Sequence, residues 1–179
     1  MGDFWVFGYG SLMWRPGFAH LECRPARLVG AHRALCVYSW VHRGTREHPG
    51  LVLGLDHGGA CRGLVFRIGA GERQTVVAYL RKREQVTNVY REVMRSVLLD
   101  DGRRVRALAY VVDRSHDQYA GRLDHETQRR LVLSARGRSG ANVDYVINTA
   151  RRLGELAIND AALLGLAASL GGKDGLSAQ

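Results

Sequence analysis

The chain has 179 residues, of which 46% are hydrophobic and 24% charged, and its formal net charge is +9. This length and composition are ordinary for a soluble globular protein, predict one domain over residues 1–170, and exclude a low-complexity tract before the tail. The arginines are scattered and do not alternate with aromatic residues, so we expect no nucleic-acid partner despite the charge. No stretch approaches the ~20 apolar residues of a bilayer-spanning helix, and no signal peptide is expected, so we predict no membrane partner.

Cysteine content bears on the compartment. Cys23, Cys36 and Cys61 are an odd number without the paired spacing of metal ligands. They predict reduced thiols in a cytoplasmic protein and no metal site.

The first predicted element is a strand over residues 4–9, which ends in the loop Tyr9-Gly10-Ser11-Leu12. Two glycines flank one tyrosine, and glycine lets other atoms approach the main chain closely. Such a loop can direct several backbone N–H groups at one phosphate or carboxylate. A simple turn is an equally good interpretation from the loop alone, because no third glycine completes a dinucleotide fingerprint and no Walker motif is present.

Strands come first in the remaining chain and helices later. Residues 26–38 contain a long strand candidate, and residues 39–50 form a polar loop. Strands are then predicted over residues 51–55 and 62–68, paired around a turn at Asp56-His57-Gly58-Gly59. A helix follows over residues 72–85, and strands over 90–99 and 105–112 form a hairpin through Asp100-Asp101-Gly102.

Helical periodicity dominates the last third of the chain. Asp124 is predicted to cap a helix that runs to about Arg136, and residues 137–140 break it. A second helix is expected over residues 143–153, and a third starts at Asn159 or Asp160 and runs to about Leu170. Residues 171–179 are predicted to be a flexible tail. The fold class is therefore α+β, with a mostly antiparallel, barrel-like sheet of about six strands, one inserted helix and a helical C-terminal third.

Glu84 stands at the end of the predicted 72–85 helix, next to Arg83. A carboxylate there meets the negative end of the helix dipole, and partial burial would raise its pKa toward neutrality. Such a group is suited to proton transfer. An ordinary surface pair with Arg81, Lys82 or Arg91 is the alternative that these residues leave open.

Several motifs, taken in order, resemble the ChaC-like γ-glutamylcyclotransferases over nearly the whole chain. They are Val6-Phe7-Gly8-Tyr9-Gly10-Ser11-Leu12-Met13-Trp14, His42-Arg43-Gly44-Thr45 with His48-Pro49-Gly50, Arg62-Gly63-Leu64-Val65-Phe66-Arg67, Arg83-Glu84 with Tyr90, Tyr119-Ala120-Gly121, and Ser139-Gly140-Ala141-Asn142-Val143-Asp144-Tyr145. The resemblance implies that the γ-glutamyl α-amine of glutathione attacks its own γ-carbonyl, which releases 5-oxoproline and cysteinylglycine. It implies no cofactor and no metal, and it leaves the oligomeric state open.

The resemblance also implies roles for particular residues. Glu84 would be the general acid and base, and Tyr9, Gly10, Ser11 and Leu12 would bind the γ-glutamyl end. Arg43 is a candidate partner of a substrate carboxylate, with a salt bridge to Glu47 as an equal alternative. Tyr119 is expected to line the pocket, its alternative being packing of a loop against the sheet.

The chain departs from the family pattern at three places. Asn88-Val89 stands where many members have Gly-Gly, the turn before Tyr119 reads Ser-His-Asp-Gln, and Arg122 replaces a proline. These departures bear on substrate specificity more than on the fold. Two other functions are left open. One is ring closure on other γ-glutamyl-amines or γ-glutamyl dipeptides, and the other is a non-catalytic module that binds γ-glutamyl compounds or anions.

Overall fold

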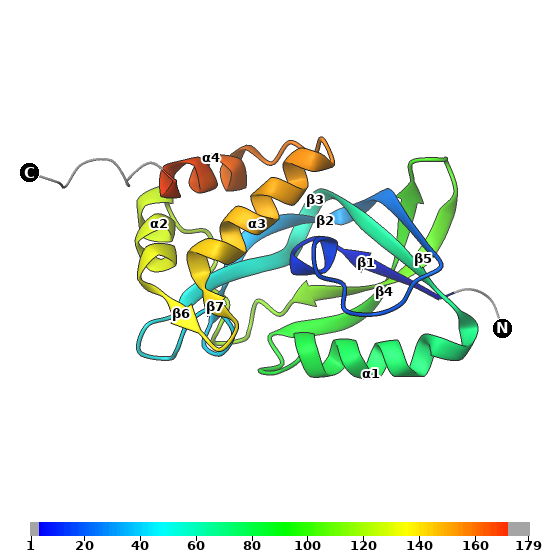
Figure 1. Cartoon of the computed structure of the whole chain (residues 1–179), viewed down its shortest axis with the longest axis horizontal. Helices are drawn as coiled ribbons and strands as arrows, with labels where there is room; N and C mark the ends of the chain where they lie inside the picture. The colour runs from blue at the N-terminus through cyan, green and yellow to red at the C-terminus, as the bar shows by residue number, and fades with distance from the viewer. Residues whose placement is uncertain (1–3, 172–179) are drawn as a thin grey trace, which may run out of the picture. The chain divides into compact units, whose positions relative to one another are not determined.

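The computed structural model describes residues 4–171, and strands β1–β5 of this part of the chain form a closed barrel (Figure 1). Their bounds are β1 Phe4–Gly8, β2 Glu22–Ser39, β3 Gly50–Ile68, β4 Tyr90–Leu99 and β5 Arg104–Val112. The spatial order is β1-β3-β2-β4-β5. β4 and β5 pair antiparallel, whereas β1 and β5 pair parallel and close the ring. The predicted α+β class with a barrel-like sheet is confirmed.

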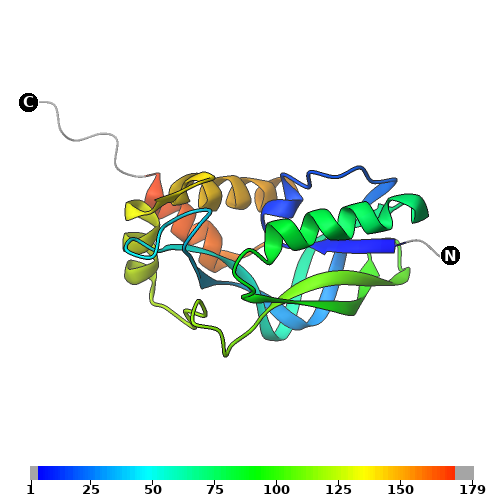
Figure 2. The same ribbon diagram turned by 90° about the horizontal axis from the view of Figure 1, so that it is seen from below.

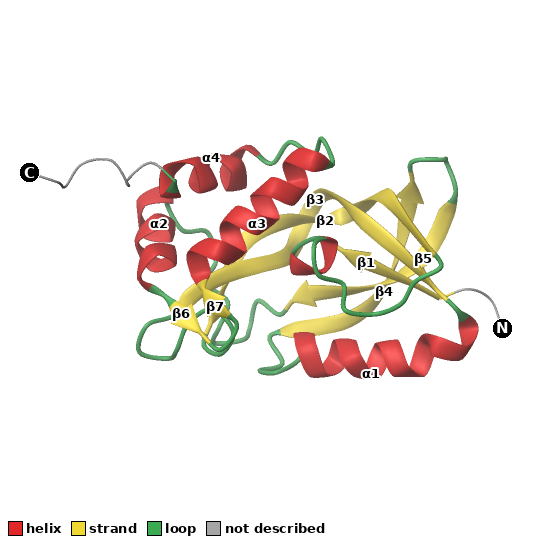
Figure 3. Cartoon of the chain, in the orientation of Figure 1, coloured by secondary structure: helices red, strands yellow, loops and turns green. Residues whose placement is uncertain are grey.

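The helices and short strands complete the described chain (Figure 3). Their bounds are η1 Ser11–Met13, η2 Ala70–Glu72, α1 Arg73–Glu84, α2 His125–Ser134, β6 Arg136–Gly137, β7 Gly140–Ala141, α3 Asn142–Glu155 and α4 Ala161–Leu170. No helix among residues 4–171 combines the length and apolar character that crossing a bilayer requires. Residues 172–179 of the predicted tail lie outside the described residues.

The chain groups into two compact units. Among the described residues, unit 1 comprises residues 4–34 and 53–119, and unit 2 comprises residues 35–52 and 120–171. In unit 1, α1 runs alongside the barrel strands, as Figure 2 shows most clearly. In unit 2, helices α2, α3 and α4 pack on one another. The expected single domain over residues 1–170 stays a prediction.

The strand count of about six is wrong, because the turn expected at Asp56-His57-Gly58-Gly59 does not form. Residues 50–68 are one continuous strand, β3, so the barrel has five strands. Gly58 and Gly59 have φ values of +91° and +71°. Two glycines in this left-handed region let the strand kink without reversing. The His32 ring Nδ1 lies 3.0 Å from the Gly58 carbonyl oxygen and ties the kink to β2.

Helix boundaries follow the predicted caps closely. The Asp124 carboxylate accepts from the Thr127 N–H at 2.9 Å and begins α2. Of the two candidates for the next cap, Asp160 begins α4 by accepting from the Leu163 N–H at 3.2 Å. Helix α2 ends at Ser134 rather than at about Arg136, because the chain turns extended and residues 136–137 pair with 140–141 as β6 and β7. This small hairpin replaces the expected break.

Candidate active site

Helix α1 places Glu84 at its last position. Val76 and Leu80 are its buried residues, and they anchor the helix to unit 1. The Gln85 N–H donates to the Arg81 carbonyl at 3.0 Å and closes the final turn. That turn carries Arg81, Lys82 and Arg83, whose positive charges interact favourably with the negative end of the helix dipole. The position of Glu84 is therefore fixed by a regular, hydrogen-bonded helix end.

Glu84 is largely shielded from solvent and paired with its neighbour. Its side chain is 17% exposed, and its Oε1 lies 3.3 Å from Nε of Arg83. Burial raises the pKa of Glu84, while the charge of Arg83 lowers it, and the net direction is upward. A carboxyl group with a raised pKa can accept and return a proton closer to neutral pH than an exposed glutamate can.

The Tyr9–Leu12 loop follows β1 directly and turns into η1. The Met13 N–H donates to the Gly10 carbonyl at 2.9 Å, which closes this short turn. The first N–H groups of such a turn have no acceptor within the turn itself. Behind the loop, Arg33 Nε donates to the Tyr9 carbonyl at 2.6 Å.

One guanidinium brings the loop and the carboxylate together. Arg83 Nη2 donates to Ser11 Oγ at 2.9 Å, and the same side chain makes the ion pair with Glu84. Arg83 Nη1 also donates to the Tyr79 hydroxyl at 2.9 Å. The sequence singled out Arg83 only as a motif residue. The spacing of Tyr79 and Arg83, four residues apart on one helix, was the available signal for their contact.

Tyr119 lies in a polar cluster of unit 1 centred on Asp56. The Tyr119 hydroxyl donates to Asp56 Oδ2 at 2.9 Å, and Arg114 Nε donates to Oδ1 at 2.6 Å. Burial acts to raise the pKa of Asp56, but these bonds outweigh it and lower the pKa. Among the described residues, Tyr119 does not hydrogen-bond to Glu84. Sequence reasoning missed Asp56 and Arg114, because it assigned Asp56 to a turn.

Arg43 belongs to unit 2 and is buried there. Its Nη1 donates to the Ala141 carbonyl at 3.1 Å, and its guanidinium lies 5.7 Å from the centre of the Tyr145 ring. No ion pair joins Arg43 to Glu47 among residues 4–171. The pKa of Glu47 is lowered by hydrogen bonds from its own backbone and from Thr45.

The motifs around Arg43 fit together through close backbone contacts within unit 2. A Cβ at Gly137 would lie 2.5 Å from the carbonyl carbon of His42 and 2.6 Å from the Arg43 nitrogen. His42 Nδ1 lies 2.9 Å from Ser139 Oγ. Only glycine allows the β6–β7 hairpin to approach the 42–44 backbone this closely, so the Ser-Gly and His-Arg-Gly motifs form one packed assembly.

Asn142 completes that assembly. Its Oδ1 accepts from the Leu51 N–H at 2.7 Å, and its Nδ2 donates to the Leu51 carbonyl at 2.8 Å. Both residues are fully buried. The asparagine of the Ser-Gly-x-Asn motif therefore substitutes for a neighbouring strand at the start of β3.

The segment after Glu84 carries one of the departures from the family pattern. Asn88 has a φ of +60°, in the left-handed region. Asparagine enters that region more readily than other residues with a side chain, so it can stand where many members have glycine. Val89 next to it is buried.

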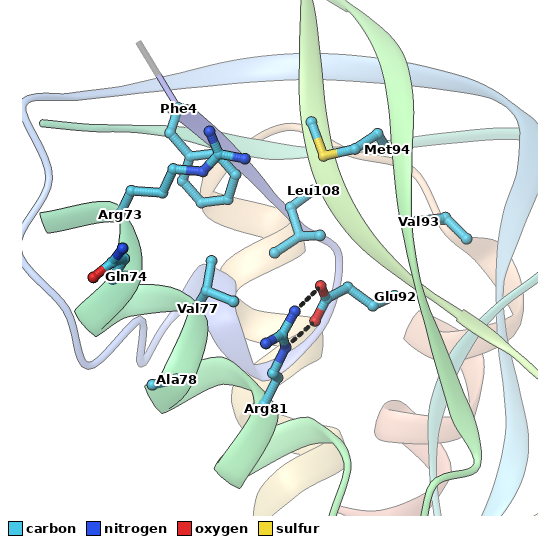
Figure 4. A pocket seen from close by; sticks show the side chains of 10 residues that line it. All are labelled: Phe4, Arg73, Gln74, Val77, Ala78, Arg81, Glu92, Val93, Met94 and Leu108. Carbon is cyan, nitrogen blue, oxygen red and sulfur yellow. Dashed lines mark hydrogen bonds and ion pairs between the residues drawn. The ribbon is translucent and has the colours of Figure 1, made fainter. Parts of the chain in front are cut away.

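A cavity of about 410 Å³ lies beside α1 (Figure 4). It is lined from α1, β4, β5 and the start of β1, and Arg81 reaches across it to Glu92 through two hydrogen bonds of 2.8 and 2.9 Å. None of the site residues predicted from the sequence lines it. No group of three His, Cys, Asp or Glu side chains suited to a metal ion occurs among residues 4–171.

Comparison with known proteins places this geometry in context. Residues 4–171 match the model of the ChaC-like protein family. The chain is 34% identical to the glutathione-specific γ-glutamylcyclotransferase of Escherichia coli, covering 94% of this chain and 73% of the relative. It is 33% identical to the human glutathione-specific γ-glutamylcyclotransferase 1, covering 82% of this chain and 68% of the relative.

Solved structures show the same fold. The crystal structure of a yeast γ-glutamylcyclotransferase specific to glutathione superposes with a TM-score of 0.86 at 22% identity, and it covers 95% of this chain and 96% of its own. A second γ-glutamyl cyclotransferase structure gives a TM-score of 0.56 at 14% identity over 93% of this chain and 88% of its own.

Proposed function

This chain belongs to the ChaC-like family, and on that premise we propose that it is a γ-glutamylcyclotransferase that cleaves glutathione into 5-oxoproline and cysteinylglycine. The observation that carries the proposal is the arrangement around Arg83, whose guanidinium contacts both Glu84 and Ser11. An acid with a raised pKa thereby stands beside the loop proposed to hold the γ-glutamyl group.

The reaction is an intramolecular acyl transfer, so the first task of the site is to hold the substrate folded. The bond from the α-nitrogen to the γ-carbonyl carbon forms, and the bond from that carbon to the cysteinyl nitrogen breaks. Holding the reacting atoms in near-attack geometry removes much of the barrier. In the proposal, the backbone N–H groups of the Tyr9-Gly10-Ser11-Leu12 loop bind the γ-glutamyl end.

Proton transfer is the second task, and we assign it to Glu84. The α-ammonium group loses two protons in becoming the ring N–H, and the departing amide nitrogen gains two in becoming an ammonium group. Glu84 takes these protons one at a time from the first nitrogen and returns them to the second. The raised pKa of Glu84 supports this role, because both transfers need a carboxyl group that changes its protonation readily.

Two further roles complete the proposal. Arg43 is assigned to a substrate carboxylate, which its buried position and fixed guanidinium support. Tyr119 is assigned to the pocket lining, with its hydroxyl oriented by Asp56. A cytoplasmic location and the absence of nucleic-acid or membrane partners stay predictions.

The test is incubation of the purified protein with glutathione, γ-glutamyl-alanine and γ-glutamyl-lysine, with 5-oxoproline measured by mass spectrometry. We expect release from glutathione well above release from the other two. Preferential release from one of the others would assign the chain to a different γ-glutamyl substrate. Binding of glutathione without release of 5-oxoproline from any of the three would identify a non-catalytic module.

A further inference from the structure

We propose that Arg83 is a positioning residue that fixes the Glu84 carboxylate and the Tyr9–Leu12 loop in one arrangement before substrate binds. The inference rests on the proposed function, because it gives Arg83 a part in the same proton transfers. It concerns a side chain that acts on the reaction through Glu84 and the loop, without touching the reacting atoms itself.

The contacts of Arg83 join parts of the chain that are far apart in sequence. Its Nη1 donates to the carbonyl oxygens of Arg15 at 2.6 Å and of Pro16 at 3.1 Å. Its Nη2 donates to Ser11 Oγ, and its Nε faces Glu84. Every nitrogen of the guanidinium is therefore engaged, and the side chain is only 18% exposed. Because all three of its nitrogens have partners, the guanidinium is held in one preferred position.

The geometry requires arginine. A guanidinium is a planar fork with five donors in fixed directions, whereas a lysine ammonium is a single point with three. The acceptors around Arg83 belong to η1, to the segment that follows it and to α1. A lysine at this position retains the charge but cannot reach Ser11, Tyr79 and Glu84 at once. Charge and positioning can thus be separated by substitution.

The charged surroundings of Glu84 support a direct effect on its protonation. Arg83 on α1 is the cation beside it and favours its ionised form against burial. From β5, the Tyr110 phenol faces the same region, and its pKa is raised first by burial, then by its hydrogen-bond partner Glu92, and in smaller part by the charge of Glu84. Arg81 on the same helix is engaged with Glu92. Loss of the Arg83 charge therefore leaves burial unopposed at Glu84.

The experiment compares Arg83→Gln, Arg83→Lys and, as a matched control, Lys82→Gln. Lys82 is the exposed neighbour on the same helical turn, and its substitution removes the same charge. Rates of 5-oxoproline release from glutathione are measured across pH, because the acidic limb of kcat/KM reports the ionisation of the free enzyme's base.

We expect Arg83→Gln to lower kcat by about 100-fold and to move the acidic limb to higher pH. Arg83→Lys should lower kcat by about 10-fold with the limb near its wild-type position, and Lys82→Gln should change neither. A purely structural role would lower the melting temperature but leave the limb in place. If the limb of Arg83→Gln coincides with that of Lys82→Gln, the inference is overturned.

A second variant keeps the test sharp if Arg83→Gln does not fold. Tyr79→Phe removes one acceptor of Arg83 and retains its charge, so kcat should fall by roughly two- to tenfold without a shift of the limb. Wild-type kcat in both Arg83→Lys and Tyr79→Phe would refute the positioning role. An inactive wild-type protein would instead count against the proposed function itself.

Discussion

Replacing Asn142 with alanine should destabilise the protein strongly, although the residue is not assigned to the chemistry. The substitution removes both hydrogen bonds between Asn142 and the Leu51 backbone, of 2.7 and 2.8 Å. It leaves the Leu51 N–H and carbonyl buried without these partners, because Leu51 is fully buried. Each unsatisfied group costs about 1–3 kcal/mol, so the free energy of unfolding should fall by about 2–6 kcal/mol for the two groups.

That loss is a large fraction of a typical total stability of about 5–15 kcal/mol. At about 2–4 °C per kcal/mol for a chain of this size, it corresponds to a fall of roughly 4–24 °C in Tm. The assay is equilibrium unfolding in urea together with thermal melting, and the matched control is Asn159→Ala at an exposed position outside the helices. A loss below about 0.5 kcal/mol, equal to that of an ordinary surface substitution, would refute the reasoning.

Three other predictions follow from the described contacts. Asp56→Asn should lower the Tm at pH 7, because Arg114 and the other hydrogen-bond donors lower the pKa of Asp56 in the folded state. The difference in Tm from wild type should therefore shrink as the pH falls below the ordinary aspartate pKa of about 3.9. Gly137→Ala should lower the free energy of unfolding in urea by about 1–3 kcal/mol, because the new Cβ would lie 2.5 Å from a backbone atom. The control Gly154→Ala, which has open space around its Cβ position, should not destabilise α3. Asn88→Val should lower the free energy of unfolding by about 1–2 kcal/mol, since its φ of +60° disfavours a β-branched side chain; an unchanged melting curve would contradict this.

Local signals in the sequence predicted much of the fold. The Asp100-Asp101-Gly102 turn joins β4 and β5 as expected, and Asp124 caps α2. These features depend on residues within a few positions of one another. The kink at Gly58 and Gly59 was mistaken for a hairpin turn, because a glycine pair between two apolar runs fits both structures. The kink contacts His32, which is distant in sequence, so this contact leaves no local signal.

The candidate site was predictable to a similar degree. Motif resemblance singled out Glu84 and the Tyr9–Leu12 loop, and the structure shows that both contact Arg83. The carbonyl acceptors of Arg83 at Arg15 and Pro16 lie far from it in sequence, and no periodicity points to them. Backbone acceptors carry no side-chain signal, so a contact of this kind emerges only from the folded chain.

The most direct test of the mechanism is the rate of 5-oxoproline release from glutathione by Glu84→Gln. As a matched control, Glu126→Gln changes a carboxylate whose side chain is 78% exposed. Loss of the general acid and base should lower kcat by about 10²–10⁴-fold in Glu84→Gln, with glutathione binding and Tm close to wild type. A Glu84→Gln protein that turns over glutathione within a few-fold of the wild-type rate would contradict the assignment of proton transfer to Glu84.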